Sequence, residues 1–135
     1  MGRPMQIGEK LKILVVDDNS AVNDVLCQLC SFLGHEVVTA KNGAEGLALV
    51  QRDGEIALVF TDFRMPVMNG VEMLRGLKDL RPTIPVVLIT GSIVEEDLGS
   101  ERTGFDAVVS KPFELKTIAA CIQQFFPEVS SSLGD

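Results

Sequence analysis

Residues 12–18 read Lys-Ile-Leu-Val-Val-Asp-Asp, a short apolar run that ends in two carboxylates. Such a run suits a strand of a parallel sheet covered on both faces better than a strand with one face in water. In folds built on parallel sheets, ligands bind beyond the carboxyl ends of the strands. Asp17 and Asp18 therefore follow a predicted strand at the place where a ligand site is expected.

Four further runs rich in β-branched residues follow along the chain, at residues 36–40, 56–60, 85–89 and 107–109. The segments between and after the runs have the apolar spacing of amphipathic helices. These predicted helices cover residues 21–33, 43–52, 70–80, 93–102 and 114–126. In the first helix one stripe contains the apolar side chains at positions 22, 25, 26, 29, 32 and 33.

Capping and stop residues support these helix boundaries. Asn42 and Asn69 each precede a predicted helix and have a glutamate three residues further on, which resembles a capping box. Gly34 and Pro127 follow the first and last helices as stop signals. The helix at 93–102 is the weakest, because Gly99 inside it costs about 1 kcal/mol relative to alanine.

Strands and helices alternate five times, which predicts a parallel sheet with right-handed crossovers and helices on both faces. The expected fold class is therefore a three-layer α/β fold of the (βα)5 type. The chain of 135 residues has the length of one typical domain. We expect this domain over residues 11–127, with loosely ordered tails at 1–10 and 128–135.

The amino-acid composition limits the classes of protein to which the chain could belong. A hydrophobic share of 46% and a charged share of 23% are typical of a folded globular domain. The net charge of −7 disfavours sequence-independent binding to nucleic acid or to anionic membranes. No apolar run approaches the roughly 18 residues that span a bilayer, and residues 1–10 lack the apolar core of a secretory signal, so we expect a cytoplasmic protein.

Polar residues follow four of the predicted strands. They are Asp17 and Asp18 after the first, Asp62 after the third, Thr90 at the end of the fourth and Lys111 after the fifth. The carboxyl ends of parallel strands meet at one edge, where three carboxylates repel one another unless a proton or a cation neutralises them. A set of oxygen ligands that leaves some coordination positions open suits Mg²⁺, which binds one or two carboxylates and a phosphate oxygen.

With Mg²⁺ bound, an ionised Asp62 could attack phosphorus and form an aspartyl phosphate. This attack needs no general base, and the single histidine, His35, is expected on the side opposite to these strand ends. Phosphoryl transfer depends mainly on positioning and on charge neutralisation. Lys111 and Thr90 could supply an ammonium group and a hydroxyl for these purposes.

The order of these polar residues along the chain resembles that in the receiver domains of response regulators in two-component signal transduction. The resemblance also rests on the Met-Pro…Gly loop at 65–70 and on the Lys-Pro-Phe step at 111–113, and it covers about residues 11–126. It implies a flavodoxin-like sheet with strand order 2-1-3-4-5. It also implies a cis Lys111-Pro112 peptide bond, which X-Pro bonds permit.

The resemblance assigns roles to the site residues. It implies that Asp62 is the phosphoacceptor and that Thr90 is the hydroxyl switch residue. Asp18, Asp62 and the backbone carbonyl of Arg64 would bind Mg²⁺ directly, and Asp17 would act partly through water.

Two features depart from the family's pattern. Most receivers carry Tyr or Phe three residues before the lysine, whereas this chain has Val108, so a switch based on an aromatic rotamer is excluded. Phe105 lies nearby and could compensate in part. Arg64 and Ser92 occupy the positions that tune the lifetime of the phosphoryl group in the family.

The leading hypothesis is a phosphorelay signalling module rather than an enzyme. A sensor histidine kinase or a phosphotransfer protein would phosphorylate it, and the face formed by helix 93–102, strand 107–109 and helix 114–126 would bind an output protein. Whether the receiver stands alone or was excised from a larger regulator or hybrid kinase stays open, and so does a phosphorylation-dependent homodimer.

Two other functions compete with this hypothesis. A Mg²⁺-dependent phosphohydrolase acting through an aspartyl phosphate normally has a second Asp two residues after the nucleophile, where this chain has Arg64. Arginine cannot act as that acid and base. A degenerate receiver that serves only as a docking scaffold would not need the intact set of polar residues.

The remaining reactive residue types are expected to be structural. Cys27 and Cys30 have the spacing of a redox motif but lie in the middle of a predicted helix, which favours reduced, structural thiols. Cys121 is expected in the core. His35 is expected to be a surface loop residue.

Overall fold

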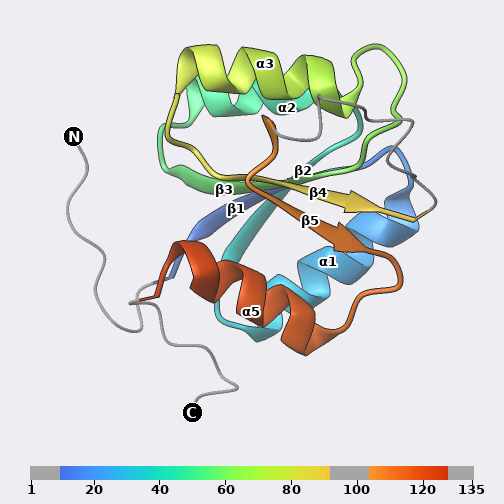
Figure 1. Ribbon diagram of the computed structural model, residues 1–135, viewed down its shortest axis with the longest axis vertical. Helices are drawn as coiled ribbons and strands as arrows, with labels where there is room; N and C mark the ends of the chain where they lie inside the picture. Colours follow the sequence, from blue (N-terminus) through green and yellow to red (C-terminus); the bar gives the residue numbers. More distant parts are fainter. Residues whose placement is uncertain (1–9, 92–103, 128–135) are drawn as a thin grey trace.

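The computed structural model describes residues 10–91 and 104–127. Its five parallel strands form one sheet in the order β2-β1-β3-β4-β5, which confirms the expected strand order. Figure 1 shows the sheet as a middle layer, with α2 and α3 on one face and α1 and α5 on the other. The strands are β1 (Lys12–Val16), β2 (Glu36–Ala40), β3 (Ile56–Thr61), β4 (Val86–Thr90) and β5 (Ala107–Ser110).

The helices are α1 (Ser20–Phe32), α2 (Gly43–Arg52), α3 (Gly70–Leu80) and α5 (Leu115–Phe125). Their boundaries agree with the predicted ones to within one residue. Asn69 and Glu72 form the predicted capping box at the start of α3. Asn42 accepts a bond from the backbone N–H of Glu45, while the Glu45 carboxylate accepts from Lys41. The helix predicted at 93–102 lies outside the described residues.

Alternate residues of β1 point into two separate cores. Ile13 and Val15 pack in the core beneath α1 and α5, and Leu14 and Val16 pack in the core beneath α2 and α3. Successive side chains of a strand point to opposite faces, so a strand buried on both faces must be apolar throughout. The continuous apolar run at 13–16 is thus explained by burial on both sides.

The apolar stripe predicted on α1 is wider than the surface that the helix buries. Val25 is 45% exposed and Phe32 is 61% exposed, so these two members of the stripe do not face the core. The buried positions are Asn23, Leu26 and Cys30, which follow one another at helical spacing. Because α1 rests on the sheet along this narrow line, Val25 and Phe32 lie outside it.

The thiols are structural, as expected. Cys27, Cys30 and Cys121 are free thiols, and Cys30 and Cys121 are buried in the core beneath α1 and α5. Burial raises the pKa of Cys30 to about 12 and that of Cys121 to about 11. A thiol with so high a pKa forms little thiolate at neutral pH and is a poor nucleophile.

His35 is buried, and the expectation of a surface loop residue is wrong. Its Nδ1 atom accepts a hydrogen bond of 3.0 Å from the backbone N–H of Leu11, and the N–H of Glu36 donates to the Leu11 carbonyl at 2.9 Å. Gly34, at φ +96°, turns the chain so that His35 returns beside the start of β1. The imidazole thus takes the place of a backbone acceptor, and burial lowers its pKa.

This burial predicts that the protein loses stability as the pH falls below about 6.5, the usual pKa of histidine. The pKa of His35 is lower in the folded state, so protons bind more readily to the unfolded chain and folding weakens on acidification. One such group can lower the free energy of unfolding by at most about 1.4 kcal/mol per pH unit. Urea denaturation at pH 7.5 and pH 5.5, followed by circular dichroism, measures the difference.

The control for this prediction is His35→Asn, whose side-chain oxygen can accept the same bond without titrating near neutral pH. The variant should lose less stability than the wild type between the two pH values. An equal loss in both proteins would assign the pH dependence to other groups.

Candidate functional site

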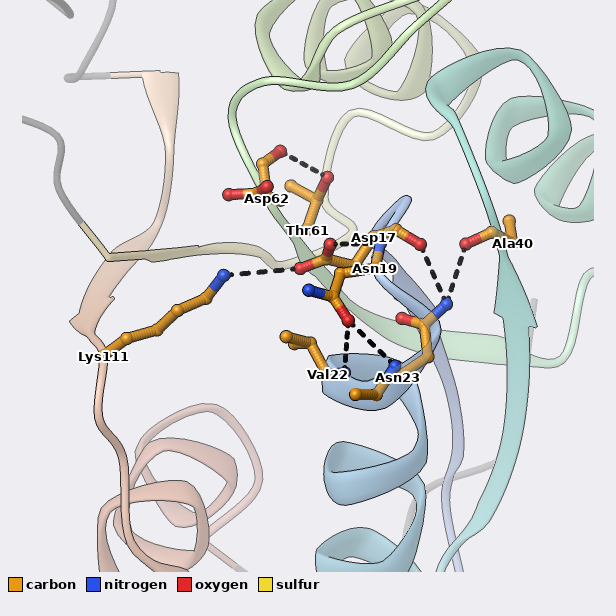
Figure 2. Close-up of polar contacts among 9 residues, drawn as sticks. Asp17, Asn19, Val22, Asn23, Ala40, Thr61, Asp62 and Lys111 are labelled. Carbon is orange, nitrogen blue, oxygen red and sulfur yellow. Dashed lines mark hydrogen bonds and ion pairs between the residues drawn. The ribbon is translucent and has the colours of Figure 1, made fainter.

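Three carboxylates meet at the carboxyl end of the sheet. One oxygen each from Asp17, Asp18 and Asp62 lies within 4.8 Å of the others. Asp17 and Asp18 directly follow β1, and Asp62 directly follows the neighbouring strand β3. Figure 2 shows Asp17 and Asp62 with Lys111, whose side chain extends toward Asp17. The structure thus brings together the acidic residues that the sequence placed at separate strand ends.

Asp17 is the most constrained of the three carboxylates. Its side chain is only 3% exposed, and its Oδ1 atom accepts a hydrogen bond of 2.9 Å from the backbone N–H of Asn19. Its Oδ2 atom lies 3.5 Å from the Nζ atom of Lys111. Its own N–H donates to the carbonyl of Ala40 at the end of β2, at 3.1 Å. Asp17 is therefore fixed in direction by both its backbone and its side chain.

Asp62 is half-buried, and its backbone is tied to two strands. Its N–H donates to the carbonyl of Val16 at 3.0 Å, and its carbonyl accepts from the hydroxyl of Thr61 at 2.9 Å. Burial raises the pKa of the Asp62 carboxyl, the negative charge of Asp17 raises it further, and the ammonium group of Lys111 opposes both effects. The ionised carboxylate of Asp62 is thus in an environment that favours an additional positive charge.

This cluster fits a hard divalent cation. All three side chains offer oxygen, Asp18 is exposed to solvent, and their close approach is unfavourable without a counter-charge. Mg²⁺ prefers such oxygen ligands and keeps some of its waters.

The other predicted site residues lie on neighbouring strand ends. Thr90 ends β4 and is buried, and its carbonyl accepts a hydrogen bond of 2.7 Å from the N–H of Lys111. The Lys111-Pro112 peptide bond is cis, as the resemblance implies. Arg64 follows Asp62 by two residues, with its guanidinium group 5.9 Å from the centre of the Phe63 ring.

The loop after β3 is shaped by a close backbone approach. The N–H of Gly70 donates to the carbonyl of Phe63 at 2.8 Å, and a Cβ atom on Gly70 would lie 2.4 Å from the carbonyl oxygen of Asp62. Only glycine fits there without moving Asp62. At the tip of the loop Val67 is 82% exposed and has a φ of 70°, a conformation that is unfavourable for a β-branched residue.

Comparison with known proteins agrees with this geometry. The sequence profile of the response regulator receiver domain matches residues 13–123, which is most of the chain. The chain belongs to the response regulator receiver domain family. The receiver has the architecture and the acidic pocket that its family membership leads one to expect.

Curated relatives of this receiver are longer proteins. The response regulator MprA of Mycobacterium leprae is 36% identical over 114 residues, which cover 84% of this chain and 50% of the relative. The DNA-binding transcriptional regulator NtrC of Azospirillum brasilense is 33% identical over 114 residues, which cover 83% of this chain and 23% of the relative. The receiver thus spans about half the length, or less, of these proteins.

Solved structures of similar receivers match nearly their whole length. A receiver domain protein from Methanospirillum hungatei has a TM-score of 0.79 and 31% identity, with 89% of this chain and 96% of that chain covered. The chemotaxis response regulator CheY4 of Vibrio cholerae has a TM-score of 0.77 and 26% identity, with 87% and 99% covered. None of the helices described in this receiver is long and apolar enough to cross a membrane.

Sequence reasoning allowed Asn19 as the cap of the first helix, but it missed the bond from Asn19 to Asp17 and the role of Asn23 in the receiver. Asn19 caps α1 by accepting from the N–H groups of Ala21 and Val22, and its own N–H holds Asp17. Asn23 is buried on the inner line of α1, and its side-chain amide donates to two backbone carbonyls at the strand ends. A polar residue at a core position of an amphipathic helix was the signal for Asn23.

Val108, which replaces the usual aromatic residue, and Phe105, which could compensate for it in part, both pack in the core beneath α2 and α3. Val108 lies on β5 and is partly buried against this core, and Phe105 is buried within it. Ser92, the other residue associated with the lifetime of the phosphoryl group, lies outside the described residues.

Proposed function

We propose that this receiver accepts a phosphoryl group on Asp62 in a Mg²⁺-dependent reaction and passes the signal to a protein partner. The observation that carries the proposal is the half-buried Asp62 carboxylate, which lies within 4.8 Å of oxygens of Asp17 and Asp18. Lys111 extends toward the same cluster, with its Nζ atom 3.5 Å from Asp17. The receiver would then catalyse only its own phosphorylation and dephosphorylation.

The proposed division of roles follows from these positions. Asp18, Asp62 and the carbonyl of Arg64 would hold Mg²⁺, with Asp17 acting partly through water. When bound, Mg²⁺ supplies positive charge that neutralises the carboxylates and the phosphoryl oxygens. The ionised Asp62 carboxylate attacks phosphorus, and the bond from phosphorus to the donor breaks, with its electron pair leaving on the donor.

Lys111 and Thr90 complete the proposed reaction site. The ammonium group of Lys111 balances charge on the transferred phosphoryl group, and the Thr90 hydroxyl donates a hydrogen bond to it. Family membership supports a histidine kinase or a phosphotransfer protein as the donor. We propose residues 11–127 as the domain, a cytoplasmic location, and an output face on residues 93–102, β5 and α5.

The phosphohydrolase alternative is weakened by the residue two positions after Asp62. This residue is Arg64, and an arginine side chain cannot serve as the acid and base of such a reaction. The scaffold alternative is weakened by the close approach of three carboxylates, which carries a cost that a purely structural role does not require.

The proposal predicts one labile phosphoryl adduct after incubation with acetyl phosphate and Mg²⁺, and no adduct when EDTA removes the metal. Intact-mass spectrometry counts the adducts, and borohydride trapping followed by peptide mapping should place the modification on Asp62. Repeated turnover of a small phosphoester would favour the phosphohydrolase. A protein that gains no adduct from acetyl phosphate or from a phosphorylated histidine donor would favour the scaffold.

A further inference from the structure

We propose that Asn23 is a positioning residue for the metal site, because its side-chain amide fixes the direction of the peptide that joins Asp17 to Asp18. The inference rests on the proposed function, in which these two residues and Asp62 hold Mg²⁺. It adds a residue on α1 whose side chain reaches neither the metal nor the phosphoryl group.

The amide of Asn23 joins three elements at the carboxyl end of the sheet. Its Nδ2 atom donates to the carbonyl of Asp17 at 2.9 Å and to the carbonyl of Ala40 at 3.3 Å. Carbonyl oxygens only accept hydrogen bonds, so the amide nitrogen must be the atom that faces them. Figure 2 shows Asn23 reaching from α1 to the ends of β1 and β2. The Ala40 carbonyl also accepts from the N–H of Asp17, so Ala40 is bonded to both Asn23 and Asp17.

The burial of the Asn23 amide is unfavourable unless its two hydrogen bonds offset the free-energy cost. The residue is only 7% exposed, and within the part of the chain that the structure describes its Oδ1 atom has no hydrogen-bond partner. A buried polar atom without a partner is destabilising. Leu26 and Cys30, on the same buried line of α1, are apolar. A leucine at position 23 would avoid the unpaired oxygen, so the two donated bonds are the distinctive contribution of asparagine.

Fixing the Asp17 carbonyl also fixes Asp18. The peptide group is planar, so the Asp17 carbonyl and the Cα atom of Asp18 lie in one plane and turn together. The Asp17 carboxylate has further restraints from the Asn19 N–H and from Lys111, whereas the Asp18 side chain is exposed. The direction in which Asp18 leaves the backbone therefore depends on the peptide that Asn23 holds.

Isothermal titration with MgCl₂, in the absence of any phosphodonor, tests this inference on the full chain. Asn23→Leu keeps a similar volume and removes both donors, and we expect its Mg²⁺ affinity to fall by about 10- to 100-fold, the usual effect of losing a partner of a metal ligand. The rate of phosphorylation by acetyl phosphate should then need more Mg²⁺ to reach half its maximum. Its maximum at saturating Mg²⁺ should stay close to that of the wild type.

The matched control is Cys30→Ala, which loosens the packing of the same helix but leaves the bonds of Asn23 in place. It should bind Mg²⁺ as the wild type does. Circular dichroism checks the fold, and Asn23→Ala takes the place of Asn23→Leu if the leucine variant does not fold. A folded Asn23 variant with the Mg²⁺ affinity of the wild type would overturn this inference and leave the proposed function standing. A wild-type protein that binds no Mg²⁺ would overturn the proposed function on which it rests.

Discussion

Asp62→Ala should abolish the phosphoryl adduct that the wild-type receiver forms with acetyl phosphate and Mg²⁺. Alanine has no nucleophilic oxygen, so the bond to phosphorus cannot form at this position. Asp79→Ala is the matched control, because it removes an exposed carboxylate at the far end of α3. Intact-mass spectrometry of both variants and of the wild type, under identical conditions, measures the result.

The neighbouring carboxylates are poor replacements for Asp62. The Asp17 carboxylate is buried and has both oxygens engaged, one by the Asn19 N–H and one near Lys111. Asp18 is exposed to solvent, whereas Asp62 is half-buried and its backbone is held by bonds with Thr61 and Val16. Survival of an adduct of normal yield in Asp62→Ala would move the phosphoacceptor to another residue and contradict the proposed role.

Phe60→Ala should lower the free energy of unfolding by about 3–5 kcal/mol, the usual loss when a buried phenyl ring is removed. Phe60 lies on β3, two residues before Asp62, and is fully buried in the core beneath α1 and α5. The loss is a large part of the 5–15 kcal/mol that stabilises a typical domain. Urea denaturation followed by circular dichroism is suitable, because the chain contains no Trp and no Tyr.

The control for this loss is the same chemical change at an exposed position. Phe32 is 61% exposed on α1, so Phe32→Ala should cost about 1 kcal/mol or less. If the two variants lost equal stability, the core assignment of Phe60 would be wrong.

The strands could be predicted closely because their signal is local. β1 and β2 have the predicted boundaries, and β3 extends by one residue to Thr61. A strand buried on both faces carries its apolar requirement in its own residues. His35 shows the limit of this reasoning. Its burial depends on a hydrogen bond to Leu11, 24 positions away in the sequence, which no local pattern indicates.

The candidate site also has a part that could be predicted from the sequence and a part that could not. Asp17, Asp18 and Asp62 could be predicted to meet because the ends of neighbouring parallel strands share one edge. Their convergence is observed, whereas their roles in binding metal and phosphoryl groups stay predictions. The partners of Asn23 could not be predicted, because they lie 6 and 17 positions away and become its neighbours only when α1 packs across the ends of β1 and β2.

The distribution of thiols also gives the receiver one practical position for an optical reporter. Cys30 and Cys121 are buried with strongly raised pKa values, so alkylating dyes should react with them slowly. Cys27 is partly exposed on α1, one turn beyond Asn23. A fluorophore on Cys27 would supply the emission that a chain without Trp and Tyr lacks, on the helix that holds the acidic pair in place.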